Sequence, residues 1–330
     1  MNTNQATGTD GGAATAVPGH LMLPYDTPRQ CASALLGLFR DELRPSETLT
    51  VAVTQPVAAC VREAVAGSGV AVEYIDITTL GQNPARLISA ISDLAASASD
   101  RVWWVEEPMW PGRSPAEVAE VARHEALVNL AFRGTSVQVV CIYSQQLLSA
   151  PELQFGESTH PSLWRDGRAG AMPGYTAAGA IPAGADLPLE PPPPDADCIS
   201  YGWALQPVRD AVAAAAAIAG VPGDRASDLV LAVHEAASNS LRHADGKGVL
   251  HTWQAAGELV CDISDSGTVV DPLAGRRRSA ADARGHGLWV ANQVCDLVQL
   301  RTRPGRTTVR FHMQAPGRLA VSVSGGRHQA

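Results

Sequence analysis

The stretch D-L-V-L-A-V-H-E-A-A-S-N-S-L-R-H, from Asp228 to His243, decides the fold of this chain. Its apolar residues recur at helical spacing, so one side of the predicted helix can face a core. Glu235 and Asn239 are four residues apart, which places a carboxylate and a carboxamide one above the other on one helical face. Taken alone, this pattern also fits a solvated helix edge.

Three further motifs follow this helix. Leu259 to Ser264 alternates like a half-buried strand and ends at Asp265-Ser266-Gly267. Gly285-His286-Gly287-Leu288 opens a second helix, predicted over Leu288 to Leu297, and an alternating run from Thr307 to Met313 closes the region. A helix with E-x-x-x-N, a strand ending in D-x-G and a G-x-G before a helix resemble the nucleotide-binding boxes of the GHKL ATPases. That superfamily includes histidine kinases and anti-sigma-factor serine kinases, and the resemblance implies a two-layer α/β sandwich.

The resemblance also implies roles for individual residues. Asn239 is the expected Mg²⁺ ligand, since a neutral carbonyl oxygen can hold the ion while the phosphates supply further oxygens. Asp265 is expected to accept the adenine amino hydrogens, and Gly267 lets the backbone approach the base. The glycines before the second helix suit phosphate at a helix N-terminus. The remaining predicted ATP-binding residues are Arg242, His243, Gly285, His286, Gly287, Leu288 and Thr307. Thr308 is the alternative to Thr307.

Glu235 distinguishes a kinase from a protein that only binds ATP. In the anti-sigma-factor kinases the matching Glu is the general base that takes the proton from a substrate serine. The alternative is that Glu235 pairs with a cation such as Arg242 or holds a metal-bound water. The second box, Asp265 to Val269, lacks the second glycine that the family often has, which leaves phosphotransfer open. The cluster Arg276-Arg277-Arg278 is expected to contact phosphate or an acidic partner, or to be solvated.

Composition sets the outer limits. The 330 residues suffice for two domains, and 45% hydrophobic with 18% charged residues is typical of globular proteins. The formal net charge of −8 argues against nucleic-acid binding. The sequence has no secretory signal and no apolar run of membrane-spanning length, so we expect a cytoplasmic protein without membrane contact. The six scattered cysteines form no C-x-x-C pair and predict buried free thiols.

The first half alternates predicted strands with predicted helices, which indicates a parallel sheet with helices on its faces. Four segments resemble the MEDS sensory domain found before such ATPases: Gly19-His20, Pro24-Tyr25-Asp26, Ile142 to Leu148, and Thr159-His160-Pro161. That family is similar to RecA-type ATPases that have lost the phosphate loop. Thr54-Gln55-Pro56 agrees, because no G-x-x-x-x-G-K-[ST] follows the strand predicted over Leu49 to Val53.

Other polar groups of the first half have less certain roles. Glu106-Glu107 is expected to be a solvated strand end. The run His124 to Asn129 repeats E-x-x-x-N but lacks the later boxes, so we interpret it as structural. His20 and His160 leave two alternatives open, a metal or cofactor held between them or ordinary polar contacts. The sequence also leaves open a small-molecule signal at the N-terminal domain.

The expected organisation has five parts. These are a disordered tail over 1–18, a MEDS-like sensory domain over 19–166, a Pro/Gly/Ala-rich linker over 167–199, a GHKL-type ATP-binding domain over 200–314 and a flexible tail over 315–330.

The resemblances together imply an anti-sigma regulatory factor with sensory input from its first domain. It would bind ATP and Mg²⁺, phosphorylate Ser or Thr of an antagonist (anti-anti-sigma) protein as a serine/threonine-protein kinase, and sequester a sigma factor. The alternative is a catalytically silent ATP-binding switch that gates protein binding. A histidine kinase needs an acceptor histidine before the ATPase domain, and residues 199–233 contain none. A scaffold that binds no nucleotide is a further alternative. Related ATPase domains are commonly dimeric, and the sequence leaves a homodimer open.

Overall fold

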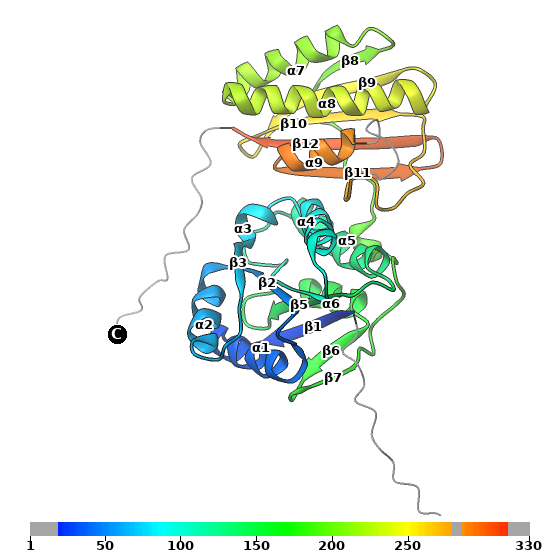
Figure 1. Ribbon diagram of the computed structural model, residues 1–330. Coiled ribbons are helices and arrows are strands. Elements are labelled where there is room, and N and C mark those ends of the chain that lie inside the picture. The colour runs from blue at the N-terminus through cyan, green and yellow to red at the C-terminus, as the bar shows by residue number, and fades with distance from the viewer. Residues whose placement is uncertain (1–18, 279–285, 316–330) are drawn as a thin grey trace, which may run out of the picture.

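The computed structural model of the chain describes residues 19–278 and 286–315. These residues form two α/β units, one built on a seven-stranded sheet and one on a five-stranded sheet (Figure 1). The first sheet is mostly parallel and the second is antiparallel, so the predicted fold class is confirmed. Within the described ranges, no helix combines the length and apolarity needed to cross a membrane.

The first sheet has the strand order β3-β2-β4-β5-β1-β6-β7, and only the β6–β7 pair is antiparallel. Its central strands are buried along nearly their whole length, as expected for a parallel sheet covered on both faces. The strands are β1 (His20–Tyr25), β2 (Thr48–Val53), β3 (Glu73–Asp76), β4 (Val102–Glu106), β5 (Val137–Ser144), β6 (Ser162–Arg165) and β7 (Arg168–Ala171).

Helices cover both faces of this sheet. One apolar core contains side chains of α1 and α2, and the other contains side chains of α4 and α5. The α5 helix begins at a capping box in which Ser114 and Glu117 satisfy each other's backbone N–H groups, with proline at the first helical position. The helices are α1 (Pro28–Glu42), α2 (Gln55–Val65), α3 (Ile77–Leu80), α4 (Ala85–Ser97), α5 (Pro115–Ala131) and α6 (Ala150–Thr159).

The second sheet has the order β11-β12-β10-β9-β8, with helices α7 and α8 lying across one face (Figure 1). Its apolar core joins that face to α7, α8 and α9. The predicted second helix ends at Val294 rather than Leu297, because Asp296 N–H donates to His312 O and the chain enters the ladder. The elements are β8 (Asp197–Tyr201), α7 (Gln206–Ala219), α8 (Gly223–His243), β9 (Gly248–Ala255), β10 (Glu258–Asp265), α9 (Gly287–Val294), β11 (Leu297–Arg303) and β12 (Arg306–Gln314).

The segment expected to be a linker, residues 167–199, is partly built into the fold. Its start forms β7, because that strand pairs with β6, and its end enters β8. Between them the chain is held on the second unit, where Arg310 donates to Glu190 O at 2.6 Å and Arg301 donates to Leu187 O at 3.1 Å. The proline-rich run is therefore attached to the second sheet rather than free.

Buried polar contacts join the two units. Glu120 of α5, whose side chain is 1% exposed, accepts from Arg276 at 2.9 Å and from Arg301 at 2.6 Å. Asn83, just before α4, donates to the side-chain oxygen of Asn292 in α9 at 3.0 Å. These contacts fix α4 and α5 of the first unit against α9 and β11 of the second.

Candidate functional site

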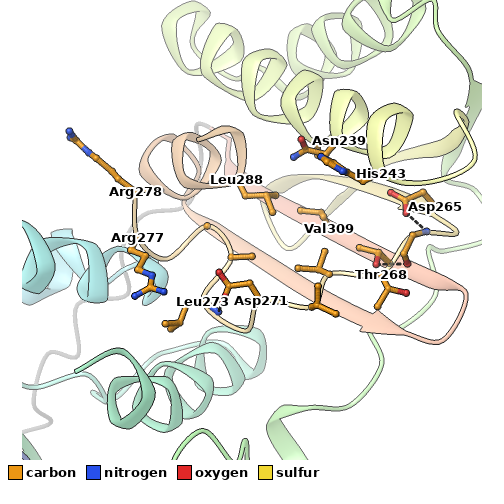
Figure 2. Close-up of a pocket in the computed structure, with 17 residues that line it drawn as sticks. Asn239, His243, Asp265, Thr268, Asp271, Leu273, Arg277, Arg278, Leu288 and Val309 are labelled. Carbon is orange, nitrogen blue, oxygen red and sulfur yellow. Dashed lines mark hydrogen bonds between the residues drawn. The ribbon is translucent and has the colours of Figure 1, made fainter. Parts of the chain in front are cut away.

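A cavity of about 820 Å³ opens in the second unit between α8, strands β10 and β12, and residues 268–278, which we name the cavity loop (Figure 2). Six of the residues predicted to bind nucleotide line it: Asn239, His243, Asp265, Gly267, Leu288 and Thr307. Arg242, His286 and Gly287 do not line it but lie within two residues of His243 or Leu288 along the chain, and Gly285 falls outside the described residues together with 279–284.

Asp265 lies at the end of β10 with its carboxylate fixed by two donors. Ser240 O–H donates to Oδ2 at 2.5 Å, and Gly267 N–H donates to Oδ1 at 2.7 Å. Tyr201 O–H in turn donates to Ser240 Oγ at 3.0 Å, and burial raises the pKa of Tyr201 to about 12. Each carboxylate oxygen keeps a further lone pair, so Asp265 can accept from a ligand without losing its fixed orientation.

Thr307 completes this end of the cavity. It lies opposite Asp265 in the β10–β12 ladder and donates to Gly267 O at 2.9 Å. Thr308, the competing candidate, points to the other face of the sheet, where it lies beside the proline-rich run. A side chain at Gly267 would bring Cβ within 2.9 Å of Asp265 Oδ1 and so would displace the carboxylate from its present position.

The α8 helix presents Asn239 and His243 to the cavity from one side (Figure 2). Asn239 Oδ1 accepts from Arg242 at 2.8 Å, which orients the carboxamide. Arg242 is exposed and also donates to Ser238 O at 3.2 Å, so its guanidinium is directed to Asn239. Because a carbonyl oxygen has two lone pairs, Asn239 can hold a hard cation while it accepts from Arg242.

The Glu235 side chain lies against Gly287, the first residue of α9. A Cβ built on Gly287 would lie 2.6 Å from Glu235 Oε2, so only glycine allows this approach. His286 caps α9, and its ring centroid lies 6.2 Å from that of Trp289. Glu235 is half-buried one turn before Asn239, next to the helix end whose free N–H groups favour anions. The structure thus brings the E-x-x-x-N helix together with Gly287, the second glycine of the predicted G-x-G box.

The cavity loop separates the three consecutive arginines. Arg277 and Arg278 line the end of the cavity far from Asp265, and Figure 2 shows their side chains pointing away from Asn239 and Asp265. Arg278 lies 4.4 Å over the Trp289 ring. Arg276 turns away and is buried against Glu120 of the first unit. Val269, where the family often has its second glycine, lines the cavity, and its N–H donates to Thr302 Oγ1 at 3.3 Å.

The cavity combines complementary groups for a nucleotide. A fixed carboxylate acceptor lies at the strand end, a carboxamide oxygen lies on α8, and two guanidinium groups lie on the cavity loop. Sequence reasoning missed Ser240 and Tyr201, which fix Asp265. Ser240 directly follows Asn239, but no local pattern shows that it faces a strand 25 residues away.

The first unit has no room for a phosphate loop after β2, since α2 starts at Gln55. Glu107 fills that place: it accepts from Thr54 N–H at 2.8 Å and from Tyr25 O–H at 2.7 Å. The expectation that Glu106 and Glu107 are solvated is wrong, because they are 0% and 4% exposed. Burial raises the pKa of Glu107, and its hydrogen-bond donors oppose that shift.

Comparison with known proteins agrees with the two units. A family model described as histidine kinase-like ATPase domain matches residues 203–313, and the model of MEDS (MEthanogen/methylotroph, DcmR Sensory domain) matches residues 19–161. Among solved structures, the histidine kinase AdeS of Acinetobacter baumannii is similar at 12% identity over 37% of this chain and 68% of that chain, with a TM-score of 0.23. No curated protein matches the chain.

Proposed function

We propose that this chain, which joins an N-terminal MEDS domain to a C-terminal histidine kinase-like ATPase domain, is an anti-sigma regulatory kinase. It binds Mg-ATP in the cavity of the second domain and transfers the γ-phosphate to Ser or Thr of an antagonist protein. The ATPase domain sequesters a sigma factor until the antagonist competes for it. Phosphorylation adds negative charge to the antagonist and weakens its binding.

The cavity between Asp265 and the start of α9 carries this proposal. Its volume of about 820 Å³ falls within the range of roughly 300–1,000 Å³ that small-molecule sites occupy. Asp265 suits the adenine amino group, Asn239 suits Mg²⁺, and Arg277 suits the phosphates. Glu235 lies beside Gly287, at the end where the γ-phosphate would be placed. Phosphoryl transfer needs mainly such alignment and charge neutralisation, with a base to orient the hydroxyl.

The interface supports the proposed sensory input. Glu120 of the MEDS domain holds Arg276, the residue next to Arg277 in the cavity loop. Asn83 holds Asn292, whose side chain also donates to Gly275 O of the same loop at 2.9 Å. A change in α4 or α5 would therefore move residues that line the nucleotide cavity.

Calorimetric titration of the full chain with Mg-ATP tests the site. Asp265→Asn replaces a charged acceptor by a partly donating group, so we expect the affinity to fall roughly ten- to hundredfold, from the 1.5–3 kcal/mol of a charge-assisted hydrogen bond. Asp210→Asn removes the same charge from the exposed surface of α7 and serves as the control. Equal affinities in the two variants would show that Asp265 does not contact the nucleotide.

A transfer assay with labelled ATP and a candidate antagonist tests the chemistry. Glu235→Gln keeps the shape of the side chain and removes its basicity, so we expect ATP to bind with transfer lost. If Glu235→Gln transfers phosphate as fast as the unmodified protein, Glu235 is not the base. A binding titration with the sigma factor, with and without ATP, shows whether nucleotide alters its binding.

Val269 favours a second candidate function, a switch that binds ATP without transferring phosphate. Its N–H is tied to Thr302, and its side chain lines the cavity where a glycine would leave the loop more freedom. A stiff loop can gate protein binding without completing a transfer site. Val269→Gly distinguishes the two functions: restored transfer in this variant, with none in the unmodified chain, would establish the silent switch.

A further inference from the structure

Four side chains that can bind metal converge in the interior of the MEDS domain. They are His20 of β1, Glu125 of α5, Cys141 of β5 and His160, the residue that follows α6, and one ligand atom from each lies within 4.8 Å of the others. All four are at most 3% exposed. They come from four different elements, and 140 residues separate the first from the last, so sequence spacing does not reveal the cluster.

Hydrogen bonds outside the cluster orient both imidazoles. Asn129 donates its amide hydrogens to Thr159 O at 2.7 Å, so its Oδ1 accepts from His20 Nδ1 at 3.1 Å. His160 Nδ1 donates to Gly156 O at 2.7 Å. With both Nδ1 atoms acting as donors, the neutral rings turn their Nε2 lone pairs towards the centre of the cluster. Metal-binding histidines in proteins are held in this way.

The ligand atoms of Glu125 and His160 also lack other partners. Tyr143 O–H donates to Glu125 Oε1 at 2.7 Å, which leaves Oε2 facing the cluster. His160 Nε2 lies 3.2 Å from Oε2, yet it is fully buried and has no hydrogen-bond partner among the described residues. Lone pairs that face each other in a buried site repel unless a proton or a metal ion lies between them, and Cys141 Sγ supplies a further metal ligand beside them.

The distances fit a tetrahedral ion. His20 Nε2 lies 3.0 Å from Glu125 Oε2 and 3.3 Å from Cys141 Sγ, and Sγ lies 3.3 Å from Oε2. Zinc bonds of about 2.0–2.3 Å give tetrahedron edges of roughly 3.3–3.7 Å, so small side-chain shifts suffice. We propose that His20, Glu125, Cys141 and His160 form a zinc-binding site in the MEDS domain. One thiolate and one carboxylate neutralise the ion, which suits a buried site.

The position of this site connects it to the ATPase domain. Glu125 and Glu120 lie on the same helix, and Glu120 is the residue that holds Arg276 and Arg301. A metal bound to Glu125 would hold α5 against the first sheet. Because α5 also contacts the cavity loop through Glu120, the metal would hold that contact in place. The metal site itself does not depend on ATP binding, so the two proposals fail separately.

Metal analysis of the full chain tests the proposal. The protein is expressed with a tag that lacks histidine, in minimal medium supplemented with zinc or with cobalt, and is purified without added metal. We expect one zinc ion per chain by mass spectrometry. The cobalt form should show the intense visible bands of tetrahedral Co²⁺ and a thiolate-to-cobalt charge-transfer band in the near ultraviolet. A cobalt-grown protein without that charge-transfer band overturns the proposal.

Two serine variants show which thiol binds. Cys141→Ser should lose the charge-transfer band and most of the bound metal. Cys261→Ser changes another fully buried thiol, in the second domain, and should retain both. Equal loss or equal retention in the two variants overturns the proposal. If Cys141→Ser does not fold, Asn129→Ala serves instead: it leaves all four ligands in place, removes the carboxamide that holds His20 and Thr159 O, and should weaken zinc binding roughly 10- to 100-fold. Unchanged zinc affinity in Asn129→Ala counts against the site.

Discussion

Two helices of this protein carry the same pattern, His-Glu-Ala-x-x-Asn, and use it differently. In α5 the pattern spans His124 to Asn129, and in α8 it spans His234 to Asn239. His124 and Glu125 are 0% exposed, whereas the matching residues of α8 are half-buried. The same six positions therefore give an internal polar cluster in one helix and the wall of an open cavity in the other.

The neighbours of each helix explain the difference. The α5 pattern faces the parallel sheet, where Glu106 accepts from His124 at 2.7 Å and Tyr143 donates to Glu125 at 2.7 Å. The α8 pattern lies where strand β10 ends and α9 begins, so Glu235 approaches Gly287 and Asn239 faces the cavity, while His234 lies 3.3 Å from Arg209 of α7. A pattern of this length specifies which side chains share a face, and the packed elements decide what that face does.

Removing the glutamate from each helix should produce the largest contrast. Glu125→Ala removes the buried carboxylate that accepts from Tyr143 and lies against His20 and His160, so we expect the free energy of unfolding to fall by about 3–5 kcal/mol. Glu235→Ala should change it by less than about 1 kcal/mol. Urea unfolding of both variants with a chelator present, followed by tryptophan fluorescence, measures this. Equal destabilisation would mean that the two glutamates have equivalent surroundings.

For Mg-ATP affinity we expect the opposite order, because the asparagine of α8 should matter more than the asparagine of α5. Asn239→Ala removes the predicted Mg²⁺ ligand, and we expect Mg-ATP affinity to fall by about 1.5–3 kcal/mol, the contribution of an interaction with a charged group. Asn129→Ala, in the matching place of α5, changes a side chain outside the cavity and should lower the affinity less. Calorimetry with and without Mg²⁺ separates loss of the metal from loss of the base. An Asn239→Ala protein that still binds Mg-ATP normally would remove Asn239 from the site.

The sequence predicts much of the difference between α5 and α8, and the features that it fails to predict have physical causes. The order of boxes around α8 predicted its fold, because each box is local and the spacing between boxes is short. Strand β1 was missed because it is buried on both faces and contains Pro24, so it does not alternate. The Glu120–Arg276 contact joins residues 156 positions apart, and the Cys141–His20 contact joins residues 121 positions apart. Packing creates such contacts, and no local pattern encodes them.

Glu120 shows whether α5 influences the cavity that α8 forms. Glu120→Gln leaves Arg276 and Arg301 without a buried counter-charge and weakens the attachment of the cavity loop to the first unit. We expect Mg-ATP affinity to fall by about 1–3 kcal/mol, the usual size of coupling between sites. Glu157→Gln, on the exposed side of α6, provides the control in the same calorimetric titration. Unchanged affinity in Glu120→Gln would mean that the contact fastens the domains without affecting the cavity.

Substituting the residue that follows the pattern should change Mg-ATP affinity the least. In α5 it is Leu130, which packs beside Gly179; in α8 it is Ser240, which links Tyr201 to Asp265. Ser240→Ala leaves the carboxylate of Asp265 free to rotate, so Mg-ATP affinity should fall by about 1 kcal/mol, roughly fivefold. Ser238→Ala removes a hydroxyl from the same helix away from Asp265 and should have no effect. If both serine variants bind equally, Asp265 does not need its internal donor, and its place at the strand end alone is enough to present it to the nucleotide.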